Sequence, residues 1–189
     1  MTENSEYLTF LNLIEKSKAD IIQSLFKQKT VKKKSYLVAE GQICRQSYIV
    51  KSGIARKFYL HSDNEITTDI YLKGDFVFSL ESFINQTKSI ENIVAVTDLD
   101  LLYINFNEMV EAKKEYNWLN EYDLMFTEQY AIQLEKKLRD RITLNATEHY
   151  EKILKTNSRL IQQVPLNIIA SYLNVSVERL SRIRASFNK

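Results

Sequence analysis

The sequence predicts an α+β fold in which a β-rich part is followed by a long helix and a pair of short C-terminal helices. Short runs of β-branched and aromatic residues, separated by turn signals, recur between residues 35 and 105. Helical periodicity then extends from about 107 to 143. Residues 165–189 contain two helical patterns separated by an Asn-Val-Ser break, which is the layout of a helix-turn-helix.

The composition is that of a globular protein. Of the 189 residues, 44% are hydrophobic and 26% are charged, and three glycines and one proline argue against long flexible linkers. Cys44 is the only cysteine, which excludes an internal disulfide framework and a cysteine-ligated iron–sulfur cluster. Neither a signal peptide nor an apolar run of about 18 residues is visible, so we expect a cytoplasmic protein with no membrane partner.

Positive charge is concentrated near the C-terminus. The net charge of the whole chain is only +2, a weak argument for nucleic acid. Residues 146–189, however, hold seven Lys or Arg against three Asp or Glu, whereas residues 1–145 have a net charge of −2. A phosphate-binding surface is therefore expected in the C-terminal quarter.

The N-terminal segment, residues 5–29, has the spacing of an amphipathic helix. Its apolar positions are Leu8, Leu11, Ile14, Ile21, Ile22, Leu25 and Phe26. The lysines at 32–34 follow, and a solvated strand edge is favoured for them over a phosphate contact, because lysine commonly protects sheet edges.

The β-rich part contains seven candidate strands, which predict an antiparallel sandwich or barrel. They are residues 36–38, 48–50, 54–60, 66–72, 76–78, 93–96 and 101–104. All three glycines, Gly41, Gly53 and Gly74, fall at the ends of these runs, where positive φ is typical.

The long helical pattern at 107–143, which Asn107 can cap, carries two apolar stripes. One consists of Leu119, Tyr122, Phe126, Tyr130, Leu134, Leu138 and Ile142, and the other of Trp118, Met125 and Ile132. Two stripes need two neighbours, so one face is expected to pack on the β-rich part and the other on a second copy, giving a homodimer through residues 110–143. The alternative is a core helix within one chain. Asn145 and Glu148 then form a capping-box pattern that starts the next helix.

The helix-turn-helix pattern is built from local signals. Pro165 suits the first turn of the first helix, Asn174 tolerates the left-handed φ of the turn, and Ser176 is the expected N-cap of the second helix. Its expected inward residues are Ile168, Ile169, Tyr172, Leu173, Leu180, Ile183 and Phe187.

The residues left outside on the second helix suit a DNA major groove. Arginine can bond guanine O6 and N7, and glutamate can accept from cytosine N4. The expected base contacts are Val177, Glu178, Ser181 and Arg182. The expected phosphate contacts, which set affinity and register, are Ser176, Arg179, Arg184 and Lys189. An amphipathic helical pair with a solvated basic face is the alternative.

Two stretches carry a resemblance to a known family. The segment YLVAEGQICRQSYIVKSGIARKFYL has a turn glycine (Gly41) and a Y-x-V-x-x-G pattern, and Gly-Asp-Phe follows at 74–76. Near the C-terminus stand Ile-Ala-Ser-Tyr-Leu at 169–173 and Leu-Ser-Arg-Ile-Arg at 180–184. Together with the order of parts, these resemble the Crp/Fnr superfamily of bacterial transcription regulators over nearly the whole chain.

The resemblance implies three regions. They are a cyclic-nucleotide-binding-like β jelly roll at 1–106, a long dimerisation helix and hinge at 107–145, and a helix-turn-helix DNA-binding domain at 146–189. Val177 replaces the family's common arginine at a base-reading position, so the preferred DNA sequence is expected to differ. Because the sequence ends at Lys189, part of the family's β-wing and its phosphate contacts are expected to be absent.

The ligand-binding stretch departs from the members that bind cyclic AMP. Phe78 and Ser79 stand where those members have Gly-Glu, and Ser89 and Ile90 replace the pair that grips the phosphate. A buried phosphate needs a charge-assisted donor such as arginine, and Lys88, on a strand, would point to the opposite face. We therefore expect no control by cyclic AMP. The possible effector pocket comprises Phe78, Ser79, Leu80, Ser89 and Ile90.

The leading hypothesis is a homodimeric transcription regulator that binds a pseudo-palindromic site in double-stranded DNA and responds to an unknown small-molecule effector, if to any. A ligand-sensing or protein-interaction module without DNA binding is the alternative. A cupin-like enzyme is disfavoured, because His61 and His149 are the only histidines and no nucleophile or phosphate-loop motif is present. We expect no catalytic residues, no metal and no cofactor.

Overall fold

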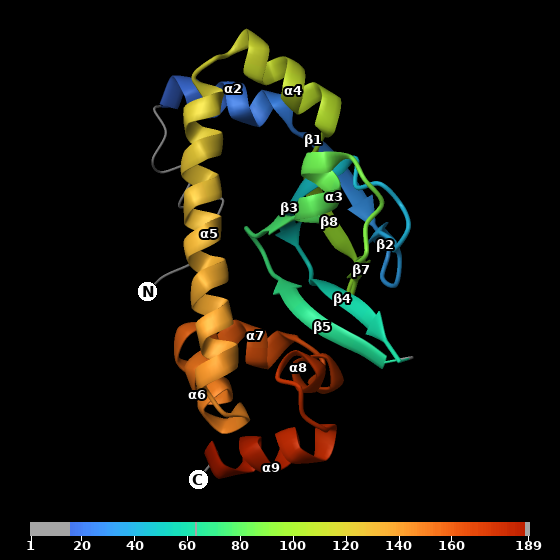
Figure 1. Ribbon diagram of the computed structural model, residues 1–189, viewed down its shortest axis with the longest axis vertical. Helices are drawn as coiled ribbons and strands as arrows, with labels where there is room; N and C mark the ends of the chain where they lie inside the picture. The colour runs from blue at the N-terminus through green and yellow to red at the C-terminus, as the bar shows by residue number, and fades with distance from the viewer. Residues whose placement is uncertain (1–15, 63, 188–189) are drawn as a thin grey trace.

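The β-rich part folds into two four-stranded antiparallel sheets. The computed structural model describes residues 16–187 except 63. The strand orders are β1-β8-β3-β6 in one sheet and β2-β7-β4-β5 in the other (Figure 1). The strands are β1 (Lys27–Val31), β2 (Tyr36–Val38), β3 (Gln46–Ser52), β4 (Ala55–His61), β5 (Asn64–Tyr71), β6 (Phe76–Val77), β7 (Asn92–Ala95) and β8 (Leu99–Asn105). This confirms the expected jelly-roll-like architecture and α+β class.

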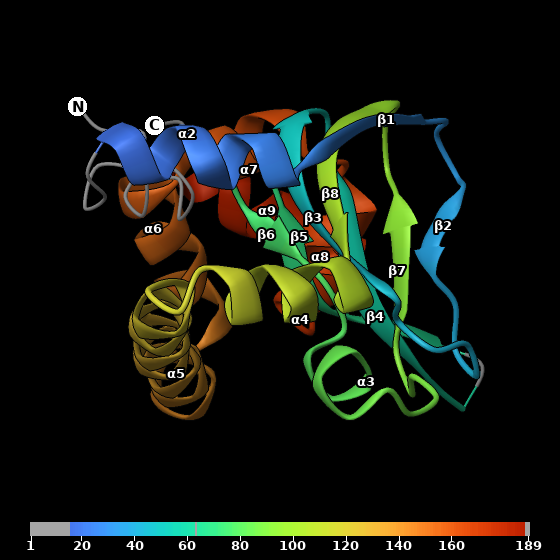
Figure 2. The ribbon, with the colours of Figure 1, turned by 90° about the horizontal axis from the view of Figure 1, so that it is seen from above.

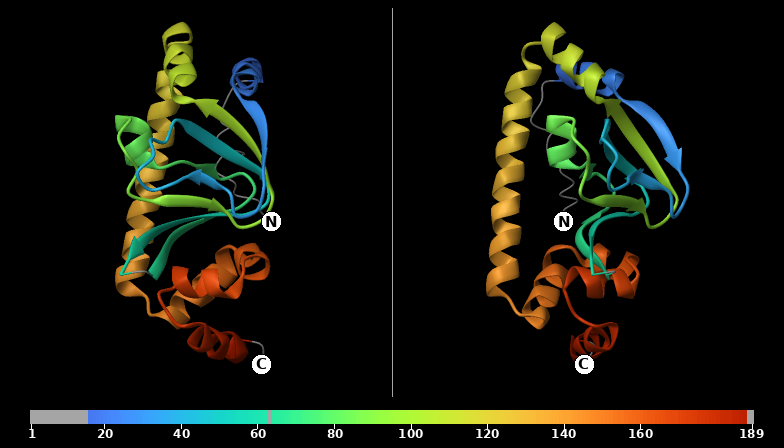
Figure 3. Two further views of the ribbon diagram at one scale, coloured as in Figure 1. Left: turned by 90° about the vertical axis from the view of Figure 1, so that its right-hand side faces the viewer. Right: turned by 45° about the vertical axis from the view of Figure 1, so that its right-hand side comes forward.

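The helices lie around this β roll. They are α2 (Lys16–Leu25), α3 (Leu80–Asn85), α4 (Phe106–Glu115), α5 (Leu119–Thr143), α6 (Ala146–Thr156), α7 (Ser158–Gln163), α8 (Leu166–Tyr172) and α9 (Val177–Phe187). Helices α2 and α4 cross one end of the roll, and α5 runs beside it, seen end-on in Figure 2. Helices α6–α9 lie at the opposite end, below the sheets in both views of Figure 3.

The N-terminal helix is shorter than expected. Helix α2 ends at Leu25, and residues 27–29, which were assigned to the helix, instead begin strand β1. Strand β1 pairs with β8 from Lys27 opposite Tyr103 to Val31 opposite Leu99. Here tertiary pairing overrides the local helical pattern. Residues 5–15 of the expected helix lie outside the described residues.

The expected long helix is two helices. Tyr116 leaves the helical region with φ −115° and ψ 82°, so α4 ends at Glu115 and α5 begins at Leu119. The Asn120 side chain donates to the carbonyls of Lys113 and Asn117, which partly satisfies the interrupted backbone. The first cap is also two residues earlier than expected: Asn105, not Asn107, forms a capping box with Glu108.

The glycines have the expected role. All three have positive φ, from 82° to 93°. At Gly53 a Cβ atom would lie 2.2 Å from the carbonyl oxygen of Asp98, so no other residue fits without moving the β7–β8 turn.

Two apolar clusters stabilise the molecule. One lies inside the β roll and includes Tyr48, Val77, Ile93 and Leu101. The other joins residues of the β roll to the C-terminal helices, because Ile54, Ile70, Leu72 and Val96 share it with buried residues of α6–α9. The C-terminal helices are therefore packed onto the sheet that contains β5, with α8 against β5 itself.

Candidate functional site

Helices α8 and α9 are joined by a sharp turn. Asn174 has φ +55°, as expected for the left-handed residue of the turn. The Val175 amide donates to the Ala170 carbonyl at 3.0 Å, and the Ser176 hydroxyl accepts from the Arg179 amide at 3.2 Å, which caps α9. The helices meet through Ile169, Leu173, Leu180 and Ile183, all buried.

The buried side of α9 determines which of its side chains face outward. Leu180 and Ile183 are buried, and Phe187 packs on Tyr150 with ring centroids 5.5 Å apart. Since each helical residue turns by about 100°, the opposite face carries Glu178, Ser181 and Arg182, all exposed. Val177 is 38% exposed at the edge of this face. The four expected base-contact residues thus lie together on the solvent side of α9.

Sequence reasoning missed one member of this face. Ala185 is exposed and lies on this face, between Ser181 and Glu178 around the helix. An alanine methyl at such a position can contact the methyl group of thymine. The helical period could have identified it, but its lack of polar atoms made it inconspicuous.

The expected phosphate contacts flank the outward face. Arg179 is exposed on one side and shares a shallow hollow with Arg182 and with Thr147 of α6. Arg184 is partly buried on the other side, and Ser176 is exposed at the start of the helix. Lys189 lies outside the described residues. The pKa of Glu178 is lowered by hydrogen bonds at the helix start, from a backbone amide and from Ser176, so its carboxylate is ionised at neutral pH.

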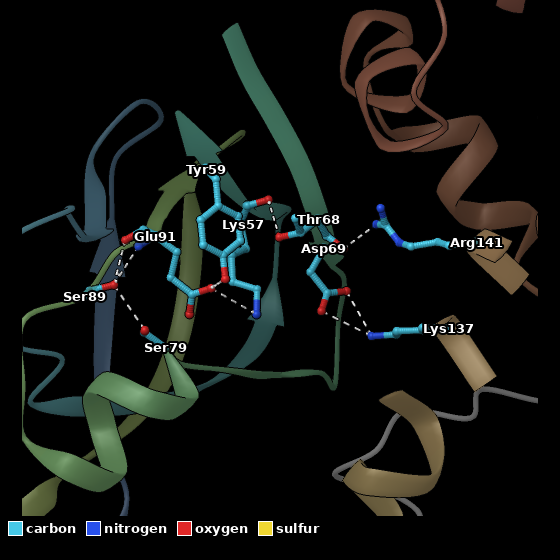
Figure 4. A network of polar contacts seen from close by, with 9 residues as sticks. All are labelled: Lys57, Tyr59, Thr68, Asp69, Ser79, Ser89, Glu91, Lys137 and Arg141. Carbon is cyan, nitrogen blue, oxygen red and sulfur yellow. Dashed lines mark hydrogen bonds and ion pairs between the residues drawn. The ribbon is translucent and has the colours of Figure 1, made fainter. Parts of the chain in front are cut away.

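The C-terminal helices are tied to the edge strand β5. The Thr67 amide donates to the Ser171 hydroxyl at 2.9 Å, and that hydroxyl donates to the Glu65 carbonyl at 2.8 Å. Arg141 near the end of α5 donates to the Thr68 carbonyl at 3.0 Å and stacks over Tyr172 of α8. Lys137, one turn earlier on α5, pairs with Asp69 at 3.1 Å (Figure 4). Strand β5 therefore contacts both the long helix α5 and the C-terminal helix α8.

A polar cavity of about 210 Å³ lies between α3, β4 and α5. It is lined by Lys57, Tyr59, Ser79, Leu80, Glu81, Ser82, Lys88, Ser89, Ile90, Glu91, Tyr130 and Leu134. The expected pocket residues Ser79, Leu80, Ser89 and Ile90 are among them. Ser79 and Ser89 are buried, and their hydroxyls lie 3.1 Å apart.

The negatively charged group in this cavity is a side chain of the protein, that of Glu91. The Glu91 carboxylate is buried, accepts from the Tyr59 hydroxyl at 2.8 Å and lies 3.5 Å from the Lys57 amine (Figure 4). Burial, followed by the bond to Glu91, raises the pKa of Tyr59. Tyr59 and Lys57 are thus engaged by an internal carboxylate, which sequence reasoning did not identify because Glu91 and Lys57 are distant in sequence.

Three details of the expected pocket differ. Phe78 does not line the polar cavity but packs at a tilt against Phe83 and Phe126 and lines a second, apolar cavity. Lys88 lines the polar cavity together with Ser89, because an isolated bridge rather than a continuous strand holds it, so strand alternation does not apply. Ile90 is 62% exposed and lies at the rim instead of filling the interior.

The histidines are far apart. His61 ends β4 in an exposed position, and His149 on α6 lies against Tyr172 with ring centroids 5.8 Å apart. Burial, followed by the charge of Arg141, lowers the pKa of His149. Within residues 16–62 and 64–187, no group of three or more His, Cys, Asp or Glu side chains could hold a metal ion. Over the same residues, no helix combines the length and apolarity that crossing a bilayer requires.

Family comparison identifies the β roll. Residues 28–116 match the family model described as "Cyclic nucleotide-binding domain". The β roll is therefore similar to a cyclic nucleotide-binding domain. No curated protein sequence matched the chain.

Solved structures extend the likeness beyond this domain. FixK2 from Bradyrhizobium japonicum has a TM-score of 0.67 at 15% identity, with 86% of this chain and 84% of that chain covered. A CooA mutant from Carboxydothermus hydrogenoformans has a TM-score of 0.63 at 20% identity, covering 100% and 86%. The c-di-GMP responsive global regulator CLP of Xanthomonas campestris has a TM-score of 0.62 at 15% identity, covering 92% of each chain. At these identities the likeness shows the fold alone.

Proposed function

We propose that the chain is a homodimeric, sequence-specific DNA-binding transcription regulator of the Crp/Fnr type, with residues 146–189 as its DNA-binding unit. Residues 1–106 would form the effector region and residues 107–145 the connection and dimer contact. The observation that carries the proposal is the outward face of α9, where Glu178, Ser181 and Arg182 lie opposite the buried seam. Such a face, with arginines on both flanks, suits insertion into a major groove.

The charges on this face support separate roles. Arg182 and Glu178 occupy the centre and would read guanine and cytosine edges. Arg179 and Arg184 lie on opposite flanks, where the two phosphate backbones of a groove would pass. Ser176, at the N-terminus of α9, would offer a backbone amide to a phosphate.

The solvent face of α5 supports the homodimer. Helix α5 has no buried residue over its 25 residues, and Leu124, Ile132, Leu138 and Ile142 are between 42% and 73% exposed. Leu124, Ala131 and Leu138 recur every seven residues, the spacing of a coiled-coil seam. A second copy of α5 would bury this seam and place two α9 helices for adjacent half-sites.

Control by cyclic AMP is not part of the proposal. In the polar cavity, Lys57 and Tyr59 already bond the carboxylate of Glu91, and a cyclic phosphate would have to displace it. Bringing a second anion beside Glu81 and Glu91 without a free arginine would be unfavourable. Isothermal titration with cyclic AMP should therefore give no micromolar binding.

DNA binding is tested by a gel-shift series with the intact protein and DNA from the region upstream of its own gene. Arg182→Ala should weaken binding to the selected site by about 1–3 kcal/mol and relax its specificity. Arg179→Ala should weaken binding to all DNA sequences to a similar extent. It should also reduce the slope of log affinity against log salt concentration by about one.

Lys114→Ala is the matched control, because it removes one positive charge from α4, at the end of the molecule opposite α9 (Figure 1). It should leave both affinity and specificity unchanged. Wild-type protein without salt-sensitive, sequence-selective binding would contradict the proposal and favour a protein-interaction module.

A further inference from the structure

A second cavity, larger than the polar one, lies between the β roll and the helices that cross its end. Its volume is about 440 Å³, within the range of about 300–1,000 Å³ typical of small-molecule sites. It is bounded by Ile22 of α2, Phe76 of β6, Phe83 of α3, Met109 of α4 and both Leu119 and Phe126 of α5. Aromatic and aliphatic side chains from five elements therefore meet around one space.

The charges at this cavity are already neutralised. Lys113 and Asp123 both line it, and they pair with each other at 2.5 Å. The Thr127 hydroxyl donates to the Asp123 carbonyl at 2.8 Å. A charged ligand would have to break the ion pair, whereas an uncharged one would leave it intact. The chemistry thus favours an uncharged, mainly apolar molecule.

The cavity and the proposed dimer seam occupy different faces of α5. At about 100° per residue, Leu119, Tyr122 and Phe126 lie on one face, and Leu124 lies roughly 160° around the helix from Phe126. A second copy packed on Leu124 would leave the cavity unoccupied, so the two occupants do not compete.

We propose that this cavity binds an uncharged apolar small molecule, and that it, rather than the polar cavity lined by Glu91, is the effector site. Helices α4 and α5 both form its wall, so a bound molecule contacts both sides of the break at residues 116–118. Helix α5 continues from this wall to Lys137 and Arg141, which contact β5 and α8. Coupling to DNA rests on the proposed function, but binding of the ligand does not.

The test uses the intact protein without DNA and the uncharged fluorescent probe N-phenyl-1-naphthylamine. We expect saturable binding at one probe per chain. Protein labelled with ¹³C-methyl methionine should show a shift of the Met109 methyl signal, which lies at the cavity, and none of Met125, which is 40% exposed on another face of α5. This measurement requires no substitution.

A pair of variants then locates the probe. Leu119→Trp fills the cavity and should weaken probe binding about tenfold or more. Leu60→Trp makes the same substitution at an exposed leucine of β4 and should leave probe binding unchanged. Absence of saturable binding, as a cavity already filled by the chain itself would give, overturns the proposal. So does a shift of Met125 in place of Met109, or an equal effect of the two variants.

The same probe separates this proposal from the DNA-binding one. If the protein binds the probe but not DNA, the ligand site is supported and its regulatory role is excluded. If the protein binds DNA but not the probe, the DNA-binding function is supported and the ligand site is excluded. If both hold, saturating probe should change the affinity for DNA, and an unchanged affinity would show that the cavity is not an effector site.

Discussion

At the scale of single residues, the buried charges of the polar cavity depend on one another. Lys57 and Glu91 are 11% and 7% exposed at their side chains, and their nearest atoms lie 3.5 Å apart. A pair this deeply buried contributes little net stability, but removing one partner leaves an uncompensated charge. The carboxylate of Glu91 retains only the Tyr59 hydroxyl as a strong donor when Lys57 is lost.

We therefore expect Lys57→Met to lower the free energy of unfolding by about 3 kcal/mol in urea titrations. The double variant Lys57→Met, Glu91→Met should be more stable than the single one, because no buried charge remains. Lys73→Met, at an exposed turn, is the control and should change stability by less than about 0.5 kcal/mol. A double variant no more stable than the single one would refute this account.

At the scale of elements, the turn between α8 and α9 rests on Asn174. Its φ of +55° is costly for a residue with a Cβ atom, and asparagine tolerates it better than alanine does. Asn174→Ala should lower the free energy of unfolding by about 1 kcal/mol, whereas Asn174→Gly should change it little. Urea titration measures both.

Asn167→Ala serves as the control for the turn, because Asn167 is exposed inside α8. There alanine is the better helix former, so no loss of stability is expected. Equal losses at positions 167 and 174 would show that the turn geometry is not responsible.

The elements that local patterns specify were predictable from sequence. All seven expected strands exist, and the capping pairs around Asn145 and Ser176 are present as expected. Local signals suffice at these places because alternative backbone conformations of the same residues are higher in free energy. The break in the long helix at 116–118 was not predictable, because no proline or glycine marks it and Asn120 satisfies the backbone through its side chain.

Strand β1 and the polar cavity needed long-range contacts. Residues 27–29 become a strand only because β8, more than seventy residues later, offers its edge. In the same way, Lys57 meets Glu91 only through the pairing of β4 with β7. The outward face of α9, in contrast, followed from its helical period alone.

At the scale of the whole molecule, His149 links pH to the docking of the C-terminal helices. It is packed on Tyr172, with Arg141 and Lys152 disfavouring and Asp140 favouring its protonated form. Because its pKa is lowered in the folded protein, the unfolded chain binds the proton more readily. Stability should be unaffected above the unfolded pKa of about 6.5 and should fall as pH drops below it.

Between about pH 7.5 and pH 5.5, urea titrations should show a larger loss of stability for wild type than for His149→Gln. His61→Gln, at an exposed strand end, is the control and should behave as wild type. If His149→Gln kept the full wild-type loss, other groups would be responsible for the pH dependence.

The proposed association of two chains through α5 belongs to the scale of the assembly. Leu138 on α5 is 60% exposed, and Leu60 on β4 is 55% exposed, so the same substitution at each tests the face without changing the chemistry. Burying a leucine contributes about 1.5 kcal/mol or more, and a symmetric dimer buries it twice. Leu138→Glu should therefore raise the dimer dissociation constant about 100-fold or more in sedimentation equilibrium, whereas Leu60→Glu should leave it unchanged. A monomeric wild type, or two variants that dissociate alike, would exclude the α5 seam as the dimer contact.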